Sequence, residues 1–261
     1  MASNFRQVEI LERARRDGKV VVEDLARHFH VTVQTIRRDL TELSEVGKLE
    51  RVHGGAIIPS GVTNIFYEER RRLNEMGKQA IAAAVAAEIP NGSSVFLNIG
   101  TTTEAVAKAL RGHAELLVVT NNLNIAQILS PNADCEIVLT GGALRRADGG
   151  LTGALAVDAV RRFKFDYAVI GGSALDLDGD LLDFDAQEIA VSQAALGRAR
   201  QRMAAIDATK LDRKAPIAIC GLDALDRLVT DAPLPPGLRA RAAEVGTEVT
   251  VARPELRAVR D

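Results

Sequence analysis

The sequence is poor in cysteine, in long apolar runs and in net charge, and each shortage excludes a class of protein. Its two cysteines, Cys135 and Cys220, lack CxxC spacing, so we expect buried, reduced thiols rather than a disulfide framework or a metal site. The longest run of small apolar residues, 80–89, contains Glu88 and is too short to cross a membrane. Residues 1–12 include acidic residues and lack a basic start followed by an apolar run. No secretory signal is therefore expected, and the protein should stay in the cytoplasm.

The composition is that of a folded protein with two domains. The 261 residues are 47% hydrophobic and 26% charged, and this length suits one small domain and one α/β domain of ordinary size. The net charge of −2 does not by itself indicate nucleic-acid binding. Any affinity for DNA would therefore depend on where the basic residues are placed.

The first 58 residues have the pattern of a small helical domain. The spacing of apolar residues predicts three helices, over residues 5–17, 23–29 and 33–46. We expect Val8, Leu11 and Ala14 to form the buried face of the first helix. Gly18 and Gly47 should end the first and third helices.

The short turn between the second and third helices is typical of a helix-turn-helix, whose second member lies in the major groove of DNA. Thr32 is a suitable N-cap for this third helix. If Ile36, Leu40 and Leu43 face the core, the outward face presents Gln34, Thr35, Arg37 and Arg38. Arginine and glutamine can read base edges, whereas arginine and threonine can also hold phosphates, so the role of each residue stays open.

A predicted β-hairpin follows the third helix. Residues 49–52 look like a strand, Gly54-Gly55 like a tight turn, and the next residues like a return strand. An arginine pair alone is most simply a solvated helix face, but this hairpin would form the wing of a winged helix-turn-helix. Its Arg51 and His53 would lie near DNA phosphates or the minor groove, although His53 could equally be a structural turn residue. The expected DNA contacts are Thr32, Gln34, Thr35, Arg37, Arg38, Arg51 and His53.

These residues resemble the signature of the DeoR family of regulators. The resemblance is carried by residues 35–40, Gly47 and residues 51–56. It implies that the first domain binds DNA. We divide the chain into this domain, a turn-rich linker, a second domain and a loose tail: residues 1–58, 59–74, 75–252 and 253–261.

The second domain alternates helices with short apolar strands. The predicted strands cover residues 94–98, 116–120, 136–140, 167–171, 203–207, 217–220 and 227–230. This βα alternation predicts an α/β fold with a largely parallel sheet covered by helices, and with ligands bound where the strands end.

Polar residues and glycines follow three consecutive predicted strands. Residues 98–103 lead from a strand into a helix N-terminus, where backbone N–H groups and threonine hydroxyls suit a phosphate. Residues 120–122 and 140–142 add small and polar groups at the same edge. Any one of these segments is most simply a capped turn, but their convergence favours a ligand site.

Two isolated ionisable residues lie further along the chain. Glu188 follows Asp185 in a predicted helix, and Lys210 follows a strand end, where it could pair with phosphate. A solvated loop lysine is the competing interpretation of Lys210. The candidate effector contacts are Asn98, Gly100, Thr101, Thr102, Thr103, Asn121, Gly141, Gly142, Asp185, Glu188 and Lys210.

The resemblance to the DeoR family continues through the second domain. It is carried by residues 89–93, 99–102, 104–107, 120–124, 148–150, 182–185 and 230–233. It implies a sensor domain similar to ribose-5-phosphate isomerase, and release of double-stranded operator DNA when a sugar phosphate binds. The motifs most resemble those of members that respond to glycerol 3-phosphate. Asn98 stands where many members have aspartate, so one possible hydroxyl-binding or acid/base group is lost. Thr209-Lys210-Leu211 replaces the usual Ser-Lys-Phe and keeps the hydroxyl and the amine.

We therefore expect a homo-oligomeric repressor of glycerol metabolism without catalytic residues, metal or cofactor. Another phosphorylated sugar is the alternative effector. The alternative from a different class is a sugar-phosphate isomerase or hydrolase with an accessory helix-turn-helix. Such an enzyme would need an acid/base pair at the pocket, and the sequence offers only Glu188 and Lys210, with no motif linking them.

Overall fold

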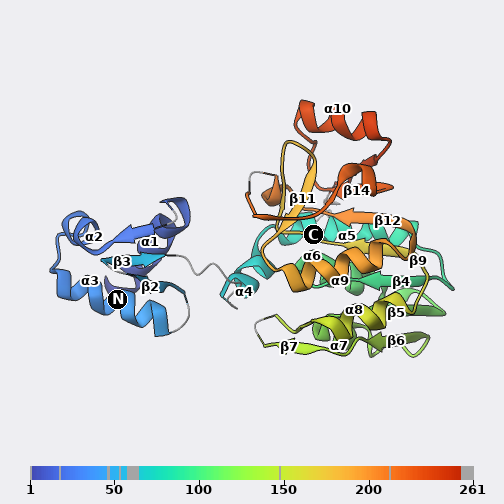
Figure 1. The fold of residues 1–261 in the computed structure, drawn as a ribbon, viewed down its shortest axis with the longest axis horizontal. Helices are drawn as coiled ribbons and strands as arrows, with labels where there is room; N and C mark the ends of the chain where they lie inside the picture. Colours follow the sequence, from blue (N-terminus) through green and yellow to red (C-terminus); the bar gives the residue numbers. More distant parts are fainter. Residues whose placement is uncertain are drawn as a thin grey trace, which may run out of the picture. The chain divides into compact units, whose positions relative to one another are not determined.

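A computed structural model divides the chain into two compact units, Met1–Glu68 and Glu69–Asp261 (Figure 1). The structure describes residues 2–17, 19–45, 48–52, 54–57, 65–146, 148–211 and 213–253. The predictions for Gly18, Gly47 and His53, residues 59–64 of the expected linker and most of the expected tail lie outside these described residues. Within the described ranges, no helix is both long and apolar enough to cross a lipid bilayer.

The first unit is a winged helix-turn-helix, as the sequence predicts. Its elements are α1 (Ala2–Asp17), β1 (Lys19–Val21), α2 (Val22–His28), α3 (Val33–Glu45), β2 (Glu50–Val52) and β3 (Gly55–Ile57). Ile10, Leu11 and Ala14 of α1 lie in its core. The prediction that Val8 is buried was wrong, because its side chain is 51% exposed. Val8 precedes Ile10 by two residues, which places it nearly on the opposite side of the helix.

The wing turn needs two adjacent glycines for different reasons. Strand β3 pairs antiparallel with both β2 and β1. Gly54 has a φ of +76°, a conformation that side chains rarely adopt. A Cβ atom on Gly55 would lie 2.0 Å from the carbonyl oxygen of Val20. The Gly-Gly pair that predicts the wing therefore permits both the turn and the close approach of β3 to β1.

A seven-stranded parallel sheet forms the centre of the second unit. In spatial order its strands are β15 (Glu248–Val251), β14 (Arg227–Thr230), β12 (Ala199–Ala205), β9 (Phe165–Ile170), β4 (Ser94–Leu97), β5 (Leu116–Thr120) and β6 (Cys135–Leu139). Along the chain, β5 and β6 follow β4 on one side of it in the sheet. The later strands β9, β12, β14 and β15 lie on the other side of β4. The strand order thus reverses between β4 and β9, and open α/β sheets bind their ligands at such a reversal.

Helices cover both faces of this sheet (Figure 1). One face packs against α5 (Glu75–Glu88), α6 (Thr101–Ala109) and α7 (Leu123–Leu129), and the other against α8 (Ala154–Arg161), α9 (Ala186–Leu196) and α10 (Pro236–Val245). The side chains of β4 alternate between the two cores: Val95 and Leu97 join the first, and Phe96 joins the second. The predicted α/β fold class is confirmed.

Shorter strands lie outside the main sheet. A hairpin is formed by β7 (Ala143–Arg145) and β8 (Gly150–Thr152), and a small antiparallel sheet by β10 (Ala174–Leu175), β11 (Asp180–Asp183) and β13 (Ile217–Gly221). The strand predicted over residues 217–220 was expected in the parallel sheet but lies in this small sheet. Only the 3₁₀ turn Ala208–Lys210, and no crossover helix, separates it from β12, whereas a parallel connection needs a longer crossover.

The two cysteines are free thiols, but the prediction that both are buried was wrong. Cys135 and Cys220 are only partly buried. Each lies in a strand at the edge of its sheet, β6 or β13, where one side of the strand has no neighbouring strand to cover it.

Candidate functional site

The exposed face of α3 carries residues predicted to contact DNA. Its core side buries Ile36, Leu40 and Leu43, and its solvent side exposes Gln34, Arg37 and Arg38. The Thr32 hydroxyl accepts a hydrogen bond from the backbone N–H of Thr35 at 3.2 Å, which caps the helix N-terminus as predicted. The two hydroxyl groups of this pair are 2.9 Å apart. The cap therefore fixes the end of α3 that would enter the major groove.

The charges of α3 leave this face basic. Asp39 is buried and pairs with Arg6 of α1, with 3.0 Å between Nη2 and Oδ1. Arg38 pairs with Glu42 at 3.0 Å, yet its side chain stays 83% exposed. Among the described residues, no hydrogen bond or ion pair engages the side chain of Arg37. Two guanidinium groups are therefore presented on the face that would meet DNA.

Arg51 connects the wing to α3. Its Nη1 atom donates to the carbonyl oxygen of Arg37 at 3.1 Å and to the hydroxyl oxygen of Thr41 at 2.9 Å. The side chain thus holds β2 beside the exposed arginines. Its contact with a DNA phosphate stays a prediction.

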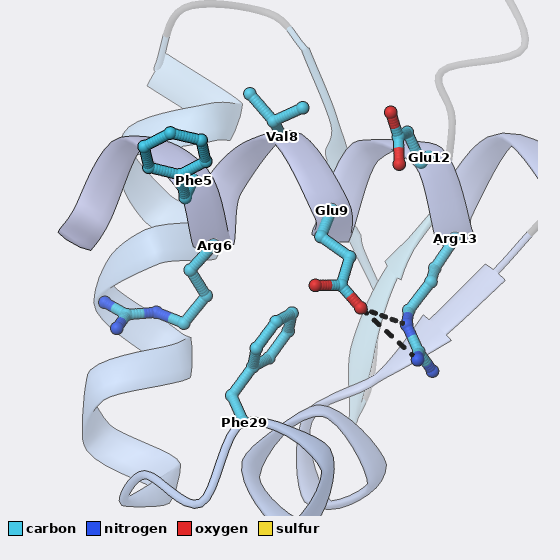
Figure 2. A pocket seen from close by; sticks show the side chains of 7 residues that line it. All are labelled: Phe5, Arg6, Val8, Glu9, Glu12, Arg13 and Phe29. Atoms are coloured by element: carbon cyan, nitrogen blue, oxygen red, sulfur yellow. Dashed lines mark hydrogen bonds and ion pairs between the residues drawn. The ribbon is translucent and has the colours of Figure 1, made fainter. Parts of the chain in front are cut away.

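A separate hollow lies beside α1 (Figure 2). Figure 2 shows Arg6 and Glu9 pointing from α1 toward Phe29, which follows α2. Arg13 pairs with Glu9 at 3.4 Å, and Arg6 pairs with Asp39. Because both arginines of this hollow are already neutralised, it has no excess positive charge to attract DNA or a phosphorylated ligand. We assign no binding site to it.

A narrow cavity in the second unit opens where the strand order reverses. It brings together five of the predicted effector contacts: Gly100, Thr101, Thr102, Glu188 and Lys210. The remaining lining residues are Arg70, Ile99, Gly171, Gly172 and Asp183. The loop after β4, the loop after β9 and the turn after β12 thus contribute to one site, at the sheet edge where ligands are expected.

The basic end of this cavity combines a helix N-terminus with a buried lysine. Helix α6 begins at Thr101, so its first backbone N–H groups have no partners within the helix. Lys210 is 5% exposed, and its amino group makes no hydrogen bond or ion pair with any described residue. Burial lowers the pKa of Lys210 to about 7, with the charges of Arg213 and Arg70 acting in the same direction. The charge of buried Asp207 acts in the opposite direction and favours the ammonium form. A phosphate beside α6 would add an anion that pairs with the ammonium group.

The same cavity is also lined by two acidic residues, Asp183 and Glu188. Arg145, on the β7–β8 hairpin, pairs with three carboxylates: Asp148 at 2.7 Å, and Asp185 and Glu188 at 2.6 Å each. Burial raises the pKa of Glu188 to about 8, and Asp183 also raises it, whereas Arg145 acts against them. Burial alone would lower the pKa of Arg145, but Asp148 and Glu188 together raise it. The carboxyl groups of Asp183 and Glu188 can accept hydrogen bonds from hydroxyl groups of a ligand.

Comparison with known proteins assigns both units. The DeoR-like helix-turn-helix domain matches residues 6–62, and the DeoR C terminal sensor domain matches residues 73–232. The chain belongs to the DeoR family. It is a DNA-binding transcriptional repressor of the DeoR type and not an enzyme.

Relatives of this DeoR-family repressor match it over nearly its whole length. The glycerol-3-phosphate regulon repressor of Escherichia coli (strain K12) is 42% identical over 90% of this chain and 93% of its own. The HTH-type transcriptional repressor CsqR of the same organism is 36% identical over 95% of each chain. Among solved structures, ribose 5 phosphate isomerase A from Neisseria gonorrhoeae is 11% identical over 52% of this chain and 53% of its own, with a TM-score of 0.39.

Several predicted effector contacts of the repressor lie behind the cavity rather than on its wall. The side chain of Asn98 donates to the carbonyl oxygen of Gly171 at 3.1 Å and accepts from its N–H at 2.9 Å, which ties β4 to β9. Thr103 turns its hydroxyl inward and donates to the carbonyl oxygen of Asn98 at 2.8 Å. Asn121 donates to the carbonyl oxygen of Leu151 at 3.0 Å. Asn98 and Thr103 thus support the loops after β4 and β9, whereas Asn121 binds strand β8, which does not line the cavity.

The other predicted contacts lie at the β7–β8 hairpin and at the start of α9. Gly141 and Gly142 precede β7 and do not line the cavity. Asp185 caps α9 by accepting from the N–H groups of Gln187 at 2.8 Å and Glu188 at 3.3 Å. It also pairs with Arg145 and so fixes Glu188 indirectly.

Three charged residues of the site were not among the predicted contacts. Arg70 falls in a charged stretch that the composition assigns to the linker, although it belongs to helix α4 (Ile65–Arg72). Asp183 is part of the family-like motif at residues 182–185 and could have been included on that signal. Arg145 lies in a hairpin too short to show a strand pattern, so no signal in the sequence indicates its role.

Proposed function

We propose that this repressor controls genes of glycerol and glycerol 3-phosphate metabolism, and that it leaves its operator when glycerol 3-phosphate binds the cavity. The observation that carries the proposal is the buried amino group of Lys210, which makes no hydrogen bond or ion pair with a described residue and lines the cavity together with Thr101, the first residue of α6. The phosphate would bind beside Lys210 and the start of α6, and the hydroxyl groups beside Glu188. Two relatives of the chain are glycerol-3-phosphate regulon repressors, which supports the choice of glycerol 3-phosphate.

In this proposal α3 reads the operator. Gln34, Arg37 and Arg38 lie on its exposed face, and Arg51 holds the wing beside them. The protein would act as a homo-oligomer, because paired helix-turn-helix units bind two half-sites of one operator. Sedimentation of the full chain tests this assembly directly.

The test of the effector site is Lys210→Ala, with Lys214→Ala as a matched control. Lys214 is an exposed lysine four residues away that does not line the cavity. Operator release is titrated with glycerol 3-phosphate for both variants and the wild type. Losing one charge-assisted contact should raise the concentration needed by about 10–100-fold in Lys210→Ala, and Lys214→Ala should match the wild type. Operator affinity without effector should not change, so Lys210→Ala should act as a super-repressor.

The chemical identity of the effector is tested with the wild-type protein. A ligand that binds the native state raises its thermal stability. We expect a shift with glycerol 3-phosphate and none with glycerol; a larger shift with fructose 1-phosphate or fructose 6-phosphate would favour the alternative of another phosphorylated sugar. If glycerol released the operator as well as its phosphate did, or if Lys210→Ala responded like the wild type, the proposed site would be misplaced.

A further inference from the structure

The last turn of α4 forms part of the wall of the effector cavity. Arg70 lines it together with Thr101, Thr102 and Lys210. Helix α4 runs from Ile65 to Arg72, and the boundary between the two units falls within it, after Glu68. The cavity wall therefore includes the helix through which the chain enters the sensor unit from the DNA-binding unit.

Polar contacts from the sensor unit hold the C-terminal end of this helix. The last carbonyl groups of an α-helix have no partners within the helix. The buried amino group of Lys78 donates to the carbonyl oxygen of Arg70 and, at 2.7 Å, to that of Leu73. The hydroxyl group of Thr101 also donates to the carbonyl oxygen of Arg70, at a long 3.5 Å. One end of α4 is thus bound to the same loop that would hold the phosphate.

Positive charges gather around this end of α4, with one buried carboxylate among them. Burial is the main reason that the pKa values of Lys78 and Lys210 are lowered; the charge of Asp207 raises both, and the charge of Arg70 lowers both. A phosphate between Arg70 and Lys210 would offset the repulsion between these two residues by attracting both. The last turn of α4 would then be held more firmly with effector than without it.

We propose that Arg70 binds the phosphate group of the effector and thereby links occupancy of the cavity to helix α4. This inference rests on the proposed function, because it concerns the same cavity. A ligand shifts an equilibrium only through its different affinity for the two states. Contact between the phosphate and Arg70 would supply such a difference at helix α4, within which the boundary between the two units falls.

The test compares Arg70→Gln with Arg72→Gln in the full chain. Arg72 is an exposed arginine in the same helical turn that does not line the cavity, so the two variants lose the same charge. Binding of glycerol 3-phosphate is measured by calorimetry, with and without operator. We expect about tenfold weaker binding for Arg70→Gln, and a ratio of the two dissociation constants closer to one than in the wild type. Arg72→Gln should match the wild type, and Arg70→Lys, which keeps the charge, should recover part of the affinity.

Hydrogen exchange gives a second readout that does not depend on DNA. Glycerol 3-phosphate should slow amide exchange in residues 65–72 of the wild type, and this protection should be lost in Arg70→Gln. Binding and protection equal to those of Arg72→Gln would overturn the inference. If Arg70→Gln bound glycerol 3-phosphate more weakly but kept the wild-type ratio between its dissociation constants with and without operator, the link to operator release would be overturned.

Inorganic phosphate distinguishes failure of this inference from failure of the proposed function. If the wild type binds phosphate but not glycerol 3-phosphate, the effector is misassigned, and the comparison of the two variants with phosphate still decides the role of Arg70. If the wild type binds neither, both proposals fail. If the wild type and Arg70→Gln bind and respond to glycerol 3-phosphate equally, only the role of Arg70 fails.

Discussion

Two buried ionisable residues, Glu188 and Lys210, line the proposed effector cavity, and burial shifts both toward their neutral forms. The pKa of Lys210 is lowered to about 7 and that of Glu188 is raised to about 8. Without a ligand, neither charge is well compensated by water. A bound phosphate would favour the charged form of Lys210 and raise its pKa, so effector binding should be coupled to proton uptake.

Affinity for glycerol 3-phosphate should therefore fall as the pH rises above about 7. Above this pH, Lys210 is mostly neutral and must take up a proton when the phosphate binds. Affinity therefore falls by up to about tenfold for each pH unit. Glu188 becomes anionic above about pH 8 and repels the phosphate, so both residues act in the same direction. Below about pH 6 the phosphate itself loses a charge. Calorimetry between pH 5.5 and 9, taken as roughly the window set by these groups, should show the tightest binding near pH 6 to 7.

The pH profile can be assigned to these residues by substitution. Lys210→Arg keeps its charge at every pH used, so only the effect of Glu188 should remain. Adding Glu188→Gln to Lys210→Arg should flatten the profile above pH 7. A wild-type affinity that did not change between pH 7 and 9 would show that Lys210 does not hold the phosphate.

At the scale of elements, most of the fold could be predicted because the strongest local signals agree with the tertiary contacts. The strands at residues 116–120 and 227–230 were predicted with the bounds that the structure has. The Gly-Gly turn and the cap at Thr32 likewise indicate features that need only nearby residues.

The remaining elements depend on partners that are distant in the chain. Strand β11 pairs with β13, more than thirty residues later, and no local pattern encodes this pairing. The cavity lies where the loops after β4 and β9 meet, and this place depends on the pairing of β9 with β4. For that reason Asn121, Gly141 and Gly142 were grouped with the phosphate loop, whereas the loop after β9 was not.

The wing provides a test of how closely two strands pack. Gly55→Ala places a Cβ atom 2.0 Å from the carbonyl oxygen of Val20 and 3.0 Å from its carbon, and these backbone atoms cannot rotate away. We expect β3 to separate from β1 at a cost of about 1–3 kcal/mol, and the amides of both strands to exchange at least about fivefold faster.

Gly54→Ala is the matched control for this prediction. No atom lies within 4 Å of a Cβ at Gly54, so only its left-handed backbone conformation opposes the change, at about 1 kcal/mol. Hydrogen exchange of the full chain compares the two variants. Slower or equal exchange in Gly55→Ala relative to Gly54→Ala would contradict the close packing of β3 on β1.

At the scale of the whole molecule, the placement of charge matters more than its sum. The net charge of the chain is −2, so its overall field does not favour DNA. On α3, however, Asp39 is turned inward against Arg6, and Arg37 and Arg38 are exposed. Operator affinity should therefore depend on a few local contacts with phosphates, and should respond to salt as a basic protein would.

We expect operator binding by the full chain to weaken steeply with salt, because each phosphate contact releases counter-ions from DNA and contributes about −0.9 to the slope of log K against log salt. Removing Arg37 and Arg38 together, as a double alanine variant, should reduce the slope by up to about 2 if both hold phosphates. If one of them reads a base instead, preference at one base pair should relax by about 1–3 kcal/mol.

The matched control is the double alanine variant of Arg161 and Arg162, two exposed arginines at the end of α8 in the other unit, which loses the same two charges. Fluorescence anisotropy with labelled operator at several salt concentrations measures all three proteins, and the control should keep the wild-type slope and base preference. A control variant that lost as much slope as the α3 variant would show that net charge, and not the face of α3, governs binding.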